Sequence, residues 1–106
     1  MKLITKEIEK KFEKHPIYSQ DGKGDAAEVI VKFFNPCGSQ SWYIIEASKT
    51  EDGDYEMFGL CTGSYFDELG YVMLSELESI RLPFGLGIER DMYWKGTIGD
   101  ARKEAR

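Results

Sequence analysis

Apolar residues recur every four positions near the start of the chain, at Ile4, Ile8 and Phe12. This spacing predicts an amphipathic helix over residues 5–14 with a narrow apolar stripe. Thr5 can cap its first N–H groups, and Pro16 disfavours helical geometry in the residue before it, so the helix should end near Lys14. A helix this short is marginal alone and needs a sheet to pack on.

From residue 28 onward the pattern changes to the alternation typical of β-strands. Residues 28–34 alternate, and residues 42–47 resume β-branched and aromatic composition after the turn Asn35-Pro36-Cys37-Gly38-Ser39, so the two runs predict a hairpin. Asp52-Gly53 is a second hairpin signal and predicts a third strand over residues 55–61. Residues 69–74 alternate again, which indicates a fourth strand and a meander.

The C-terminal third mixes both kinds of signal. Ser75 and Glu78 have capping-box spacing, which predicts a short helix from Ser75, and Pro83 should end the helical region. Residues 88–94 indicate a last short strand. Residues 99–106 offer little to bury and are expected to form a fraying tail after a single domain over residues 1–98.

The predicted fold class is therefore α+β. We expect a single antiparallel sheet of about four or five strands, with an N-terminal helix and a second short helix packed on it. The chain of 106 residues leaves room for one hydrophobic core.

Charge and hydropathy restrict the partners. The formal net charge is −5 and the sequence pI is about 4.9, so the chain as a whole would repel a polyanion. The only basic cluster is Lys6, Lys10, Lys11 and Lys14. No apolar run is long enough for a signal peptide or a transmembrane helix, so we expect a cytoplasmic protein without a membrane partner.

Metal and cofactor chemistry is not indicated. Two cysteines and one histidine are too few for a Cys/His zinc site of ordinary spacing, and a cytoplasmic disulfide is not expected. We expect Cys37 in an exposed turn and Cys61 as a small buried residue. The loop aspartates match no EF-hand spacing and are expected to be solvated, so we predict no metal and no cofactor.

Arg90 is the most informative charged residue, because in the strand interpretation it shares a face with Ile88 and Met92. A guanidinium on an apolar face needs a carboxylate or several carbonyls as partners. It is either a structural ion pair or a ligand contact. Its neighbours Glu89 and Asp91 belong to the same candidate site.

Aromatic residues provide the second candidate site. If the helices leave one sheet face uncovered, its aromatic side chains would form a docking surface. The aromatic candidates are Tyr18, Trp42, Tyr43, Tyr65, Tyr71, Tyr93 and Trp94. The residues proposed for such a surface are Tyr18, Asp21, Trp42 and Tyr43. No catalytic motif is recognised, and no catalytic residue is assigned.

Several stretches carry a resemblance to a known family. They are residues 68–81 (ELGYVMLSELESIR), residues 87–91 (GIERD), Leu3-Ile4-Thr5, Tyr18-Ser19-Gln20-Asp21, Val31-Lys32-Phe33-Phe34, Trp42-Tyr43 and Phe58-Gly59-Leu60. The chain resembles the uncharacterised bacterial family catalogued as domain of unknown function 2958. The resemblance implies a small stand-alone protein often encoded near plasmid, phage or conjugative-transposon genes, and it transfers no functional residue.

Three functions remain open at this point. The first is a non-enzymatic protein-interaction or regulatory accessory module of a mobile genetic element, which binds another protein. The second is a nucleic-acid-binding accessory protein that uses the Lys6–Lys14 helix or the aromatic sheet. The third is a small enzyme that uses carboxylates and Arg90.

Overall fold

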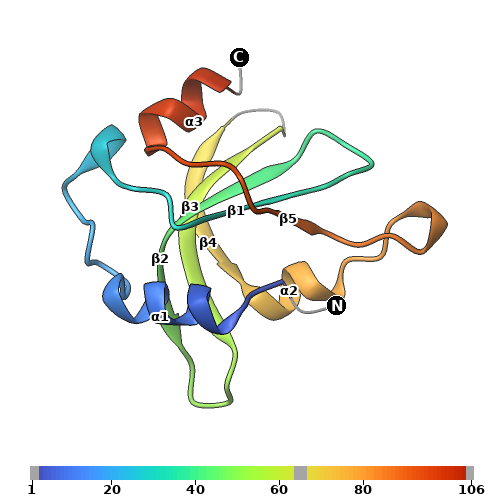
Figure 1. Cartoon of the computed structure of the whole chain (residues 1–106), viewed down its shortest axis with the longest axis horizontal. Coiled ribbons are helices and arrows are strands. Elements are labelled where there is room, and N and C mark those ends of the chain that lie inside the picture. The colour runs from blue at the N-terminus through green and yellow to red at the C-terminus, as the bar shows by residue number, and fades with distance from the viewer. Residues whose placement is uncertain (1–2, 64–66, 105–106) are drawn as a thin grey trace.

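Five strands pair into one antiparallel sheet in the computed structural model, which describes residues 3–63 and 67–104 (Figure 1). The strands are β1 Val31–Phe34, β2 Ser41–Lys49, β3 Tyr55–Thr62, β4 Glu68–Met73 and β5 Glu89–Asp91. Their spatial order is β4-β3-β2-β1-β5. The predicted meander of four strands is thus confirmed, and the fifth strand returns to pair with β1. The fold is α+β.

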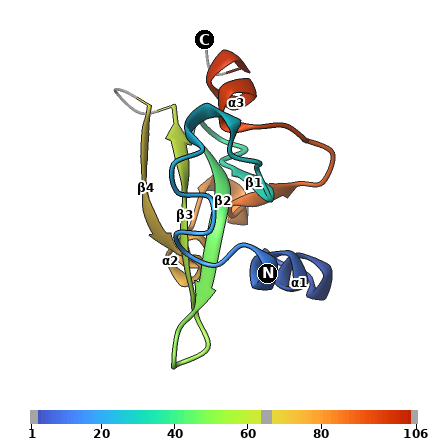
Figure 2. The same ribbon diagram turned by 90° about the vertical axis from the view of Figure 1, so that its left-hand side faces the viewer.

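Among the described residues, three α-helices and two short 3-10 turns accompany the sheet. They are α1 Lys6–Lys14, η1 Gly24–Ala26, α2 Leu74–Ser79, η2 Pro83–Gly85 and α3 Ile98–Glu104. Figures 1 and 2 place α1 and α3 toward opposite ends of the sheet.

Each face of the sheet has its own apolar cluster, because neighbouring residues of a strand point to opposite faces. Trp42 and Ile44 lie in the larger cluster, which includes residues of α1 and α2. Tyr43 and Ile45 lie in the smaller cluster with Ile98 of α3. The helices therefore cover different faces.

The N-terminal helix forms as predicted. The Thr5 hydroxyl oxygen accepts a hydrogen bond from the N–H of Ile8 at 3.2 Å, and the helix ends at Lys14. Phe12 is fully buried, and its ring centroid lies 5.3 Å from that of Tyr55 on β3. The apolar stripe thus docks α1 on the sheet.

The second helix begins one residue earlier than Ser75, and the predicted Ser75–Glu78 capping box is wrong. The Glu76 carboxylate accepts a hydrogen bond from the N–H of Met73 at 2.9 Å. Ser75 instead donates its hydroxyl and its N–H to the Asp54 carboxylate, at 2.5 and 3.1 Å. Asp54, in the β2–β3 turn, therefore binds Ser75, the residue that the sequence spacing assigned to a capping box.

The prediction of a fraying tail is wrong over residues 99–104, which belong to α3. Ile98 and Ala101 are fully buried against residues of the smaller cluster. At the start of the helix, the Asp100 carboxylate accepts from the N–H of Thr97 at 2.9 Å. Two apolar residues three positions apart are enough here, because Ala27 and Leu60 supply a surface that local sequence cannot reveal. Residues 105–106 lie outside the described residues.

The last strand is shorter than the predicted 88–94. One Asp91 carboxylate oxygen accepts from the N–H groups of Tyr93 and Trp94, at 3.0 and 3.1 Å, and turns the chain out of the sheet. Met92 is consequently exposed and does not share the buried face with Ile88.

A β-bulge in β2 changes its register against β3 between Ile44 and Glu46. Gly59 lies opposite the bulge, and a Cβ atom at this position would be 2.0 Å from the Tyr43 carbonyl oxygen. The close approach therefore requires glycine. The shift places Glu46 opposite Phe58, on the face that carries α3.

The two cysteines differ in exposure. Cys37 is exposed, as predicted, whereas Cys61 is half-buried instead of fully buried. Burial, together with the nearby Glu68 and Asp67 carboxylates, raises the pKa of the Cys61 thiol. A thiol with a raised pKa is a poor nucleophile at neutral pH.

Candidate functional site

One buried carboxylate on β2 shapes the loop between α1 and β1. Glu46 is only 3% exposed, and its two oxygens accept hydrogen bonds from the backbone N–H groups of Tyr18 and Gln20, each at 2.8 Å. These charge-assisted bonds satisfy a carboxylate that would be costly to bury alone. They fix the loop to the sheet.

The Gln20 side chain is a second buried anchor of the same loop. Its amide nitrogen donates to the carbonyl oxygens of Glu28 and Ile45, both at 2.8 Å, and its amide oxygen accepts from the N–H of Glu28 at 2.7 Å. One side chain thus ties both ends of the loop to β2. Buried polar networks that are fully satisfied make a structure rigid.

Tyr18 adopts a conformation that these anchors enforce. Its φ angle is 76°, in the left-handed region that residues other than glycine seldom adopt. Such a conformation costs about 1–3 kcal/mol and clusters at functional sites. The side chain is 72% exposed, so the fold holds a strained backbone for an aromatic residue that adds little to the core.

Tyr18 lines a hollow beside α3, on the same face of the sheet and near β3 and β4. The hollow has a volume of about 380 Å³. We call it the aromatic hollow and define it by Tyr18, Asp21, Ile45, Glu46, Phe58, Leu69 and Tyr71. The rings of Phe58 and Tyr71 are in contact, with centroids 4.8 Å apart, and Tyr71 is 55% exposed.

The charge of the aromatic hollow has one sign. Among the described residues that line it, Asp21 and Glu46 are the charged ones, and none is lysine or arginine. Partial desolvation, the Tyr18 hydroxyl and the carboxylates of Glu46 and Glu56 raise the pKa of Tyr71. The Tyr71 phenol therefore stays neutral at physiological pH, and the hollow presents aromatic surface beside carboxylates.

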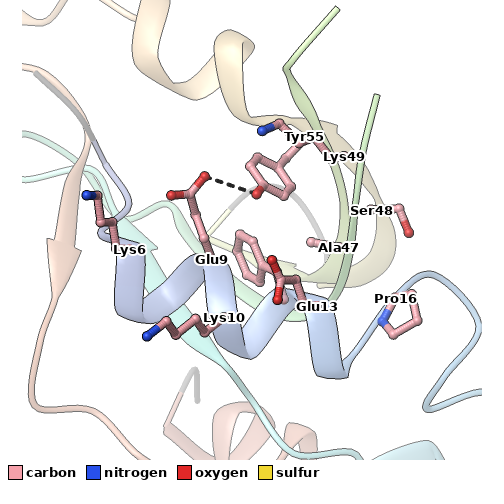
Figure 3. Close-up of a pocket in the computed structure, with 10 residues that line it drawn as sticks. Lys6, Glu9, Lys10, Glu13, Pro16, Ala47, Ser48, Lys49 and Tyr55 are labelled. Atoms are coloured by element: carbon pink, nitrogen blue, oxygen red, sulfur yellow. Dashed lines mark hydrogen bonds between the residues drawn. The ribbon is translucent and has the colours of Figure 1, made fainter. Parts of the chain in front are cut away.

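A larger groove of about 490 Å³ lies between α1 and the β2–β3 hairpin (Figure 3). Its floor is apolar and includes Phe12, while the Tyr55 hydroxyl donates to the Glu9 carboxylate at 3.1 Å. Figure 3 shows Glu9 and Tyr55 facing each other, whereas Lys6 and Lys10 extend away from them. Desolvation and Glu9 raise the pKa of Tyr55, the opposite of what a phenolate base or nucleophile needs.

Arg90 lies at the opposite edge of the sheet from the aromatic hollow, on β5. Its guanidinium donates to the Leu3 carbonyl oxygen at 2.5 Å and so ties the N-terminal segment to the sheet. The observed partner is thus one backbone carbonyl, whereas the prediction was a carboxylate or several carbonyls. Asp91 holds the turn after β5 and lies 3.9 Å from the Lys32 ammonium, and Glu89 pairs with Phe34 in the β1–β5 register.

Trp42 and Tyr43 are buried and lie on opposite faces, so they do not share an exposed docking surface. The Tyr43 hydroxyl donates to Glu104 of α3 at 3.0 Å, and its ring packs edge-on against Trp94. Burial and Glu104 raise the Tyr43 pKa far above its ordinary value. Tyr43 thus anchors α3.

Phe84 is a further exposed aromatic residue with a left-handed backbone, at φ 63°. It lies in η2, on the loop that projects beyond β5 in Figure 1. The loop closes on itself through a backbone bond from the N–H of Leu82 to the carbonyl of Leu86, at 2.9 Å. A single exposed ring needs no functional explanation.

Of the residues proposed from sequence, Tyr18 and Asp21 line the aromatic hollow, while Arg90 and Asp91 line a separate hollow of about 480 Å³ beside α1. Tyr71, one of the aromatic candidates, joins Tyr18 and Asp21 at the aromatic hollow, whereas sequence reasoning missed Glu46, Phe58 and Leu69. One signal was present: Glu46 interrupts the apolar run of residues 42–47, and an acid in a buried strand requires dedicated partners.

Two further observations concern metals and membranes. Within residues 3–63 and 67–104, no group of three or more His, Cys, Asp or Glu side chains is arranged to hold a metal ion. None of the described helices has the length and apolar character needed to span a bilayer.

The fold defines a small α+β protein in which a meandering antiparallel sheet gains a fifth strand beside its first. Within this class, the chain belongs to the family described as protein of unknown function (DUF2958), whose model matches residues 3–99. The resemblance seen in the sequence is thereby confirmed. Comparison with curated proteins and with solved structures gave no match.

Proposed function

We propose that the protein is a non-enzymatic interaction module that binds another protein through the aromatic hollow. The observation that carries this proposal is the pair of exposed tyrosines at the hollow. Tyr18 lies on a loop that the buried Glu46 holds in place, and Tyr71 lies on β4, which pairs with β3. The function fits an accessory or regulatory factor of a bacterial mobile element that acts in the cytoplasm.

Aromatic side chains with polar tips are the residues that most often dominate protein interfaces. In the aromatic hollow they are joined by Phe58 and Leu69, which makes a contiguous apolar surface instead of scattered exposed residues. Because Glu46 and Gln20 already order the loop, binding would not have to supply that ordering free energy.

The charge of the hollow indicates the chemistry of the partner. Asp21 is the exposed charge that lines it, and the described lining residues include no cation, so it favours a segment that combines an apolar side chain with a lysine or arginine. Phosphate groups would be repelled at the same place. This favours a protein over a nucleic acid as the partner of the aromatic surface.

The test is a selection from a displayed library of random peptides against the whole chain. We expect enriched peptides that carry an aromatic or aliphatic residue close to Lys or Arg. Tyr71→Ser should weaken binding of the best peptide at least tenfold, about 1.4 kcal/mol. Tyr93→Ser is the matched control, because Tyr93 is 91% exposed and lies outside the hollow.

Two results would contradict the proposal. One is a selection that enriches no peptide whose binding depends on Tyr71. The other is an equal loss of affinity in Tyr71→Ser and Tyr93→Ser, which would indicate general adhesion to exposed tyrosines.

A further inference from the structure

The two edge strands of the sheet differ in how they are protected. β5 has three residues, all charged: Glu89, Arg90 and Asp91. β4 has six residues, Glu68–Met73, of which only the first is charged. Short length and charge are the usual means by which an edge strand avoids pairing with another chain. β5 has both.

β4 lacks the common protective features. Residues 67–73 contain neither lysine nor proline, and all six residues pair with β3 without a shift in register, from Glu68 with Cys61 to Met73 with Glu56. Figure 2 shows β4 at the outer edge of the sheet. Among the described strands it pairs with β3 alone, so its second edge is open for hydrogen bonding.

Gly70 in the middle of β4 is not required by the fold. A Cβ atom added at Gly70 would meet nothing within 4 Å, in contrast to Gly59 on the neighbouring strand. Glycine weakens a strand interior and often marks a place where another backbone approaches closely. Gly70 points to the sheet face opposite that of Leu69 and Tyr71, so its missing side chain leaves that face of β4 open.

The open edge adjoins the aromatic hollow, because Leu69 and Tyr71 belong to both. A strand added along β4 would direct every second side chain toward the face that carries the hollow. Main-chain hydrogen bonds would supply affinity and the hollow would select side chains, as in other complexes formed by strand addition.

We infer that the partner binds as an extended segment that pairs with the open edge of β4 and places alternate side chains at the aromatic hollow. This inference rests on the proposed function and specifies its binding mode. The occupant is a Lys- or Arg-bearing segment of another protein, since Asp67 and Glu68 at the start of β4 add to the acidity of the hollow. A second copy would bring the same two carboxylates and no cation on its own residues 67–73.

The inference is tested with the best library peptide, synthesised with a single N-methyl group at each backbone nitrogen in turn. Only alternate N–H groups of an added strand would face β4. Methylation at every second position of the paired peptide segment should therefore weaken binding at least tenfold. Methylation at the positions between them should weaken it less than about twofold. Amides of β4 that face outward should also become protected from hydrogen exchange in the complex.

Charge reversal at the two edges gives a control on the protein side. Glu68→Lys adds a protective lysine to β4 and should weaken the same peptide at least tenfold, whereas Glu89→Lys on β5 should leave its affinity within about twofold.

Failure of this inference can be distinguished from failure of the proposed function. Peptides that need Tyr71 but show no alternation on N-methylation, and no new protection of β4 amides, would overturn strand addition while the hollow remains the binding site. A free chain that is dimeric in light scattering, with β4 amides already protected, would make a second copy the occupant and would also overturn it.

Discussion

The backbone N–H of Tyr18 donates to the buried carboxylate of Glu46 at 2.8 Å, and Tyr18 is thereby held in a left-handed conformation beside Tyr71. A residue in the interior of the sheet thus positions an exposed aromatic side chain from a loop far away in sequence. The Glu46 carboxylate is therefore a positioning group for the aromatic hollow.

Replacement of Glu46 by glutamine should destabilise the fold and disturb the hollow. The amide offers one acceptor oxygen where the carboxylate offers two, so the N–H of either Tyr18 or Gln20 would face an NH₂ group. The expected loss is about 1–3 kcal/mol in the free energy of unfolding, measured by urea denaturation. Glu56→Gln, an exposed change on β3, is the control, and equal effects in the two variants would refute the role of Glu46.

Asp54 should make stability depend on pH in acid. Its carboxylate accepts from Ser75 at the start of α2, and this hydrogen bond is the main cause of the lowered pKa of Asp54. A lowered folded-state pKa means that the contribution is present above the ordinary Asp pKa of about 3.9 and is lost as the pH falls through the lowered value. Asp54→Asn should therefore be less stable than wild type at pH 6, with the difference shrinking toward pH 2. A difference independent of pH would contradict the assignment.

Arg90→Met should have a modest structural effect and none on peptide binding. The guanidinium donates to the Leu3 carbonyl and is only partly buried. Its removal from this contact leaves a backbone carbonyl, and not a carboxylate, without its partner. We expect the free energy of unfolding to fall by about 1–2 kcal/mol. Faster hydrogen exchange should be confined to the N-terminal segment. Loss of peptide affinity in this variant would transfer the binding site to β5.

Ile98→Ala tests whether α3 belongs to the core. Ile98 is fully buried in the smaller cluster, and truncation of such a residue typically costs about 2–5 kcal/mol. Lys103→Ala on the exposed side of the same helix should cost less than about 0.5 kcal/mol. If thermal unfolding of both variants matches wild type, α3 does not contribute to the stability of the domain.

Local sequence signals predicted those elements whose determinants lie within a few residues. The stripe of Ile4, Ile8 and Phe12 and the Asp52-Gly53 turn sufficed for α1 and the second hairpin. The start of α2 and the existence of α3 were missed because Asp54 and Ala27, which contact them, are distant in the chain.

The aromatic hollow was only half predictable, for the same reason. Tyr18 and Asp21 stood out as loop residues, but Tyr71 joins them only through the order of the strands and the bulge that turns Glu46 toward the loop. The predicted meander already made β3 and β4 neighbours, but the bulge is not encoded in the alternation of apolar residues.

The most direct test of the central claim is amide chemical-shift mapping of the whole chain with the best library peptide. The largest changes should fall on residues 18–21, on Phe58 and on residues 69–71, which surround the aromatic hollow. Changes centred instead on Glu9 and Tyr55 in the α1 groove, or on residues 83–87 around Phe84, would contradict the claim that the hollow is the binding site.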